Sequence, residues 1–373
     1  MASNKNQHFV PRCYLREFTL SSENKAINVY NIDTNRCIPK APVKNQCSRD
    51  YFYGKDEKLE SAIQLVESAY AYALRDIING PRQLTDGQTN VLKRFWLLQY
   101  LRTEAASRRS VETNKGLTEV AGLQGDDFSL GIKEAVQMAM KTYASNMNVI
   151  DDLKICLIYN KTDFPFVTSD DPAVLSNKWH LNDWRTRFGS FGLSTCGDLL
   201  FLPLTPKIMC IAYDSDVYSI SNKDGWATIS HINDVKAFNE HQFLNCRANI
   251  FLKNVEHQSF VCESFDEISH HRPHERHRIN YAVLDCSNGK YSTYKVVDLA
   301  EADGHQQAII HTETIHHRPA TWPSVIGWRI NGRVYTNRSG LGYLREYHLA
   351  EHQGFYKEPI TLRKKHPKDQ NNW

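Results

Sequence analysis

The sequence predicts an α+β protein in which a helical segment is inserted between β segments. Three observations support this fold class: a β-hairpin pattern over residues 26–40, helical patterns across about residues 55–148, and strand patterns across residues 149–256. No repeat with a period of 20–50 residues is visible.

The composition is that of an ordinary globular protein. The 373 residues are 41% hydrophobic and 23% charged, and this length favours two domains. A net charge of +3 is far below the excess usual in nucleic-acid-binding proteins, so it permits such a partner without arguing for one. The nine cysteines are scattered without a C-x-x-C pair, which indicates reduced thiols in a cytoplasmic protein. No signal peptide or long apolar run is present, so we expect no membrane association.

The opening segment, residues 1–54, combines a short helical turn with the hairpin. Pro11 suits the first position of that turn, and Tyr14, Leu15 and Phe18 form its apolar face. In the hairpin, "AINVYNI" alternates apolar and polar residues as a first strand does, "DTN" is the turn, and "RCIPK" is the second strand.

Three helices are expected next. The first runs from Glu57 to Asn79 and is stopped by "NGPR". The second starts at Thr85 with Gln88 completing a capping box, and it extends to about Val111. A loop containing Gly116, Gly122 and Gly125 leads to the third, roughly Leu130 to Met147.

Residues 149–256 then turn to β-structure. The segments "LKICLIYN", "FPFVTSDDP", "LLFLPLTP" and "KIMCIAYD" are typical of strands. A helix with Asn233 as its N-cap follows, and then a short "NIFL" strand. Residues 1–256 are therefore expected to form one domain.

The remaining residues are divided into three parts. Residues 257–279, which include "SHHRPHERHR", form a basic linker; Pro273 disfavours the helix that would align the histidines, so a zinc site is not expected. Residues 280–360 are β-rich, with hairpins at 279–297 and around the Asn-Gly of "GWRINGRVYTN". Residues 361–373 are expected to be disordered.

The motif "QHFVPRCYLREF" resembles the N-terminal signature of the domain of unknown function 4238 family, proteins of bacteria and phages with a His-Tyr-Val-Pro motif. Phe9 stands at the tyrosine position. Later features agree in order: "ESAIQLVE", "QYLRTEAASRR", "PFVTSDDPAV" with Asp171 at the usual asparagine, "FLPLTP" and Asn239. The resemblance covers about residues 5–255 and implies no established activity.

Helical geometry turns one arginine toward the core. Arg102 lies in the apolar stripe of the second helix, and a buried guanidinium needs an anionic partner. Glu60 and Glu67 lie seven apart on the first helix and therefore share one face. Two interpretations stay open: an ion pair of Arg102 with Glu67 or Glu60 that braces the helices, or an arginine that also binds an anion in a cavity. Arg108 and Arg109, near the end of the same helix, are expected in solvent.

The "TSDDP" segment places polar residues at a strand end. Ser169, Asp170 and Asp171 precede Pro172, a pattern that suits either a site or a simple turn. Because adjacent strand residues point to opposite faces, one aspartate at most is expected to act as a base or metal ligand, and Asp170 is the candidate.

The opening motif adds a histidine. His8 is suited to proton transfer near neutral pH, with Arg16 as a candidate phosphate contact; the alternative is that His8 only caps the turn. Asn239 either orients these groups or bonds a neighbouring backbone.

Two functions follow from these candidates. The first is a phosphodiester-directed, nuclease-like hydrolase with a role in phage–host conflict. In this hypothesis His8 and Asp170 are the catalytic residues, and substrate is bound by Arg16, Arg102 and Asn239. The supporting residues are Glu60, Glu67, Ser169 and Asp171. A divalent metal and a nucleic-acid or nucleotide partner fit this hypothesis. The second is a non-catalytic binding or regulatory module whose inward polar residues form a structural network. Neither a Walker loop nor a G-x-G-x-x-G, G-x-S-x-G or H-E-x-x-H motif is present.

Overall fold

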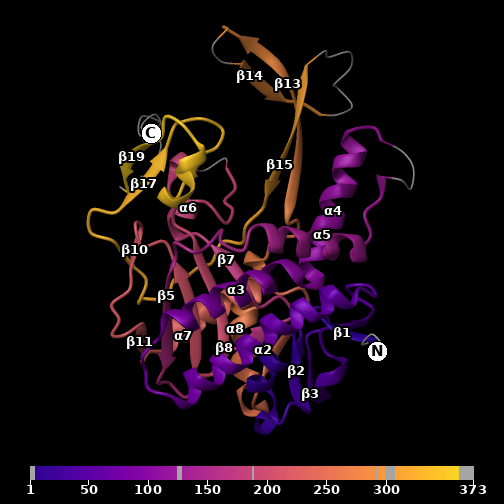
Figure 1. Cartoon of the computed structure of the whole chain (residues 1–373), viewed down its shortest axis with the longest axis vertical. Helices are drawn as coiled ribbons and strands as arrows, with labels where there is room; N and C mark the ends of the chain where they lie inside the picture. Colours follow the sequence, from indigo (N-terminus) through magenta and orange to yellow (C-terminus); the bar gives the residue numbers. More distant parts are fainter. Residues whose placement is uncertain (1–4, 124–127, 187–188, 290–291, 299–306, 361–373) are drawn as a thin grey trace.

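A computed structural model describes residues 5–123, 128–186, 189–289, 292–298 and 307–360. Helices and several small sheets alternate along the chain, so the α+β prediction is confirmed (Figure 1). The largest sheet has five strands in the order β11-β5-β9-β8-β7, and only the β11–β5 pair is parallel. Its strands are β5 (Lys154–Asn160), β7 (Val174–Ser176), β8 (Leu199–Thr205), β9 (Ile208–Tyr213) and β11 (Trp226–Ile229).

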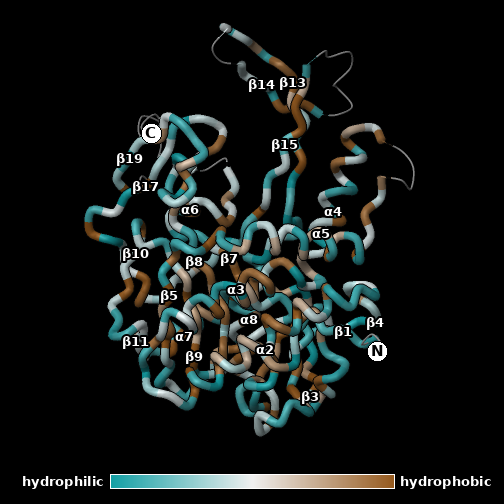
Figure 2. Tube along the Cα trace, viewed as in Figure 1, coloured by the Kyte–Doolittle hydropathy of each residue, from teal (hydrophilic) through white to brown (hydrophobic). Residues whose placement is uncertain are grey.

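Both faces of this sheet are buried, because β8 and β9 are apolar on alternating sides. Leu200 and Leu202 pack in one cluster with the helical residue Phe95, whereas Leu199 and Phe201 belong to a second cluster on the other face. Hydrophobic residues accordingly concentrate around β5, β8 and α3 (Figure 2). The strands predicted at "LKICLIYN", "LLFLPLTP" and "KIMCIAYD" are confirmed, whereas only Thr168–Ser169 of "FPFVTSDDP" forms a strand.

A four-stranded sheet joins segments that are far apart in the chain. Its order is β3-β2-β12-β6, with the bounds β2 (Ala26–Asn31), β3 (Arg36–Pro42), β6 (Thr168–Ser169) and β12 (Asn249–Leu252). The predicted hairpin and the "NIFL" strand are confirmed. In addition, β1 (Asn6–His8) pairs with β4 (Ser48–Asp50), which fixes the opening motif at the edge of the molecule.

The helical segment contains four helices rather than the three predicted. They are α2 (Glu57–Asn79), α3 (Asp86–Arg102), α4 (Glu104–Val120) and α5 (Ile132–Ser145). The capping box of Thr85 and Gln88 is present. The prediction of one helix to Val111, followed by a loop at Gly116, is wrong: Thr103 is extended (φ −69°, ψ 158°) and its hydroxyl caps a new helix, α4.

The late helix α7 (Ile232–Asn245) is buried along most of its length, including polar residues such as Gln242. Its N-cap is His231, so the predicted cap at Asn233 is wrong. Helix α8 (Gln258–Ile268) packs against α7 within the segment predicted as a linker. Short helices are α1 (Arg12–Leu15) and α6 (Lys178–Asn182), and 3-10 turns lie at Arg16–Phe18, Leu20–Ser22, Val43–Asn45, Trp184–Thr186, Val255–His257, Ser269–His271 and Glu346–Glu351.

The C-terminal strands form an arm and two small sheets. The arm, β13 (His277–Ser287) with β14 (Ser292–Val296) and β15 (Ala308–Thr314), projects from the globular part (Figure 1) and confirms the pairing predicted for residues 279–297. The prediction of a hairpin around the Asn-Gly pair is wrong. β16 (Gly327–Trp328) pairs with β10 (Tyr218–Ser219), whereas β17 (Arg333–Thr336) pairs with β18 (Tyr343–Leu344) and β19 (Tyr356–Pro359).

Residues beyond 256 share a hydrophobic cluster with the five-stranded sheet. Val334 and Tyr335 are buried in the same cluster as Phe201. The domain division at residue 256 stays a prediction, and residues 361–373, predicted to be disordered, lie outside the described residues. In the described part of the chain, no helix combines the length and the apolar character needed to span a membrane.

Candidate functional site

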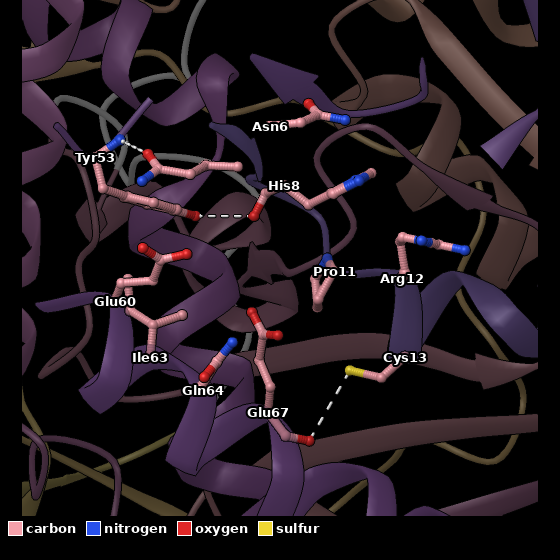
Figure 3. Close-up of a pocket in the computed structure, with 11 residues that line it drawn as sticks. Asn6, His8, Pro11, Arg12, Cys13, Tyr53, Glu60, Ile63, Gln64 and Glu67 are labelled. Carbon is pink, nitrogen blue, oxygen red and sulfur yellow. Dashed lines mark hydrogen bonds between the residues drawn. The ribbon is translucent and has the colours of Figure 1, made fainter. Parts of the chain in front are cut away.

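The opening motif and helix α2 enclose a small cavity, which we call the opening pocket. Its volume is about 190 Å³. His8, Pro11 and Cys13 line one side, and Glu60, Gln64 and Glu67 of α2 line the other (Figure 3). The α2 residues follow a spacing of four and three, which places them on one helix face. The structure therefore brings three of the predicted site residues, His8, Glu60 and Glu67, to one cavity.

His8 is half-buried and held at both its backbone and its ring. Its carbonyl accepts a hydrogen bond from the Tyr53 hydroxyl (3.1 Å), and its Nδ1 lies 3.1 Å from the carbonyl oxygen of Gln46. Burial and the nearby Arg12 lower the pKa of His8, so the ring is neutral at pH 7. Because a carbonyl can only accept, Nδ1 carries the proton and Nε2 is left as an acceptor. The ring points away from Glu60 (Figure 3).

Arg102 lies behind the pocket and forms the predicted ion pair with Glu67. Its side chain is 0% exposed, and Nη1 lies 2.7 Å from Oε1 of Glu67. When the amide oxygen of Gln99 faces the guanidinium, it accepts from Nε (2.6 Å) and Nη2 (3.0 Å). Arg102 does not line the pocket. Of the two interpretations left open by the sequence, the bracing pair with Glu67 is confirmed.

Glu60 and Glu67 differ in whether their carboxylates have a partner. Glu60 lines the pocket, and no other described residue makes a hydrogen bond or an ion pair with its carboxylate. Glu67 keeps 24% of its side chain exposed and uses Oε1 for Arg102. The charged side chains that line the pocket are thus the carboxylates of Glu60 and Glu67 and the guanidinium of Arg12.

The two aspartates of the "TSDDP" segment have separate structural partners. Asp170 accepts hydrogen bonds from the backbone N–H groups of residues 247–249 at 2.8–3.0 Å. Asp171 accepts from Thr103 Oγ1 (2.6 Å) and pairs with Arg109 Nη1 (2.7 Å). Arg109 was expected in solvent and is instead paired here, because the break at Thr103 turns α4 toward Asp171.

Ser169 and Asn239 are also held in the interior. The Ser169 hydroxyl donates to Gln242 Oε1 (2.8 Å). Asn239 accepts from the backbone N–H of Val167 (3.0 Å) and donates to the carbonyl of Pro165 (3.0 Å). Asn239 therefore bonds a neighbouring backbone, one of the two alternatives the sequence left open.

Arg16 lies on the surface beside a different cavity. Its Nε donates to the carbonyl of Ser22 (3.1 Å), and its neighbours there include Glu17 and Arg75. The predicted set thus divides into the opening pocket, the "TSDDP" network and the isolated Arg16. Among the described residues, no group of three or more His, Cys, Asp or Glu side chains is arranged to hold a metal ion.

Sequence reasoning missed Gln64, Tyr53 and Gln99. Gln64 lies four residues after Glu60 and three before Glu67, so helical spacing could have identified it. Tyr53 and Gln99 carry no such signal, because their roles depend on how β1, α2 and α3 come together.

One family model, described as a protein of unknown function (DUF4238), matches residues 6–256. Neither the curated proteins nor the solved structures contain a match to this chain.

Proposed function

The chain belongs to the DUF4238 family, and from the opening pocket we propose that it is a non-catalytic binding module that accepts a cationic side chain of a protein or peptide partner. The observation that carries this proposal is Glu60, a carboxylate that lines the cavity and has no partner among the described residues. A lysine or arginine side chain would supply the missing charge.

The shape of the pocket supports the same ligand. A volume of about 190 Å³ is below the roughly 300–1,000 Å³ typical of sites for whole small molecules. Pro11 and Ile63 supply apolar surface for the aliphatic stem of a long side chain, while Glu60 and Glu67 face its charged end.

A phosphodiester-directed hydrolase with a role in phage–host conflict has less support. His8 and Asp170 contact different parts of the fold, and Arg102 already has Glu67 and Gln99 as acceptors. A phosphate in the opening pocket would meet two carboxylates, Glu60 and Glu67, against the single guanidinium of Arg12, so the lining disfavours it. The inward polar residues instead support the structural-network hypothesis.

The experiment is a binding titration of the full chain at low salt with N-acetyl-arginine amide. N-acetyl-citrulline amide, nearly isosteric and neutral, is the matched ligand control. We expect weak, salt-sensitive binding of the arginine compound and at least roughly tenfold weaker binding of citrulline, as a charge-assisted hydrogen bond implies.

Two variants locate the binding. Glu60→Gln should remove the preference for arginine, whereas Glu57→Gln, an exposed change one turn earlier on α2, should leave it unchanged. Equal binding of citrulline, or an unaltered arginine preference in Glu60→Gln, contradicts the proposal.

A further inference from the structure

A second group of polar side chains lies where the arm meets the C-terminal end of α7. Arg276 directly precedes β13, and its carbonyl accepts a hydrogen bond from the N–H of Ile315 (2.9 Å). This backbone pairing places His316 next to Arg276 at the base of the arm. None of these residues lines the opening pocket.

Arg276 belongs to one network with Arg109. Arg276 Nη2 donates to Asn245 Oδ1 (3.1 Å), and Asn245 Nδ2 donates to the carbonyl of Asp171 (2.7 Å). The carboxylate of Asp171 pairs with Arg109. A third arginine, Arg272, donates to the carbonyl of Cys246 (2.9 Å) at the end of α7.

These three arginines have too little negative charge around them. Within the described part of the chain, Asp171 is the carboxylate that they contact, and it pairs with Arg109 alone. The neighbouring Asp170 directs its oxygens to backbone N–H groups of residues 247–249. Burial and the proximity of Arg109 lower the pKa of Arg276 to about 10, as expected of crowded cations.

Capping of the C-terminal end of α7 accounts for only some of the hydrogen-bond donors of Arg276. Its two Nη atoms reach Leu244 O (3.4 Å) and Asn245 Oδ1 (3.1 Å), as a basic residue near a helix C-terminus can. Its Nε is buried and has no hydrogen-bond partner in the described part of the chain. A buried donor without a partner is costly, so this atom requires an acceptor that the described residues do not provide.

Two neutral donors lie beside the arginines. His316 Nε2 accepts from the N–H of Phe191 (3.3 Å), and burial lowers the pKa of His316 to about 3, so the proton is on Nδ1. The Tyr100 hydroxyl makes no hydrogen bond with any described residue, and Arg109 and Arg276 are among its charged neighbours. Both side chains are partly exposed and can reach a ligand from solvent.

We propose that Arg109, Arg276, Tyr100 and His316 form a binding site for a phosphate group. Guanidinium groups bind phosphate oxygens in bidentate fashion, and the two neutral donors can reach the remaining oxygens. A carboxylate has two oxygens and would leave some of these donors without a partner. The site is independent of the opening pocket, so either proposal can fail alone.

The test is calorimetric titration of the full chain with inorganic phosphate and, separately, with AMP, in a phosphate-free buffer of low ionic strength. We expect saturable binding with a stoichiometry of one ligand per chain. Tighter binding of AMP supports the site with a nucleotide as the phosphate source; equal or tighter binding of inorganic phosphate supports it with the free ion as the source. Absence of binding by both ligands overturns the proposal, as does acetate binding that matches phosphate.

Three variants complete the test. Arg276→Gln should weaken phosphate binding roughly tenfold or more. Tyr100→Phe removes only a hydroxyl that makes no hydrogen bond within the described ranges, so the fold should be kept while binding weakens roughly threefold. Arg36→Gln, an exposed change on β3, is the control and should bind as the wild type does. Wild-type affinity in folded Tyr100→Phe and Arg276→Gln overturns the proposal.

Discussion

The buried guanidinium of Arg102 has acceptors from two helices. Arg102 ends α3, and its partners come from α2 and from the preceding turn of its own helix, through Glu67 and Gln99. Removal of one partner from such a group leaves the other charge buried and uncompensated. The residue therefore fixes the distance between α2 and α3 rather than offering its charge to a ligand.

Replacement of Arg102 tests this role. Arg102→Met should lower the free energy of unfolding by about 3–5 kcal/mol, because Glu67 and Gln99 lose their partner. Arg108→Met is the matched control: Arg108 is 39% exposed, and its partner Glu104 keeps Arg49, so the loss should stay below about 1 kcal/mol. Urea unfolding followed by circular dichroism measures both, and similar losses in the two variants contradict the account.

The site residues differ in how far the sequence could predict them. Helical periodicity was sufficient to turn Arg102 toward the core and to name Glu60 and Glu67 as its candidate partners, because all three lie in long regular helices; the choice of Glu67 came from the structure. Asp170 could not be interpreted in this way, since its partners at residues 247–249 follow about 77 residues later and are brought to it by β12 pairing with β6. Long-range backbone contacts of this kind leave no local pattern.

At the scale of elements, one threonine decides where the helical segment bends. Thr103 ends α3, caps α4 through the N–H of Ala106 (3.1 Å) and donates its hydroxyl proton to Asp171 (2.6 Å). The bend also brings Arg109 to Asp171. Apolar periodicity continues across this position, which is why the sequence predicts one helix.

Thr103→Ala should therefore lower the free energy of unfolding by more than the loss of a helix cap alone would. We expect a decrease in unfolding free energy of about 2–4 kcal/mol, from the cap and from the hydrogen bond to a buried carboxylate. Thr85→Ala removes the exposed cap of α3 and should cost about 1 kcal/mol. If denaturant unfolding gives equal losses, the link between Thr103 and Asp171 does not stabilise the fold.

Local sequence patterns also failed to predict how the C-terminal β-strands pair. The Asn-Gly pair gives Asn331 the positive φ of 56° that such a turn favours. The strands beside it nevertheless pair elsewhere, β16 with β10 and β17 with β18 and β19.

At the scale of the whole molecule, residues beyond 256 complete interactions that begin in the family-matched region. Arg345 lies 2.6 Å from both Asp152 and Asp198, and Asp198 is fully buried. On α7, Glu240 accepts from the N–H of Thr321 (3.2 Å), and Asp234 accepts from the N–H of Ser324 (2.6 Å). Removal of the C-terminal residues takes these donors away, and Asp198 then keeps only the neutral Asn177 Nδ2 (3.4 Å) among its described partners.

A chain truncated after residue 256 should consequently fail to unfold cooperatively. The point variant Arg345→Met should be destabilised by about 3–5 kcal/mol in the full chain, since Asp198 is left as an uncompensated buried charge. Urea titrations of both proteins provide the measurement. Cooperative unfolding of residues 1–256 with the stability of the full chain would show that the predicted domain is independent.

The central claim is that the chain binds a partner and that the residues predicted as catalytic maintain its structure. The most direct measurement is turnover of RNA, DNA and bis(p-nitrophenyl) phosphate by the purified full chain, with and without Mg²⁺ or Mn²⁺, beside His8→Ala and Asp170→Asn. The account predicts that the wild type releases product no faster than buffer with every substrate. Cleavage by the wild type that either variant abolishes while remaining folded would contradict it.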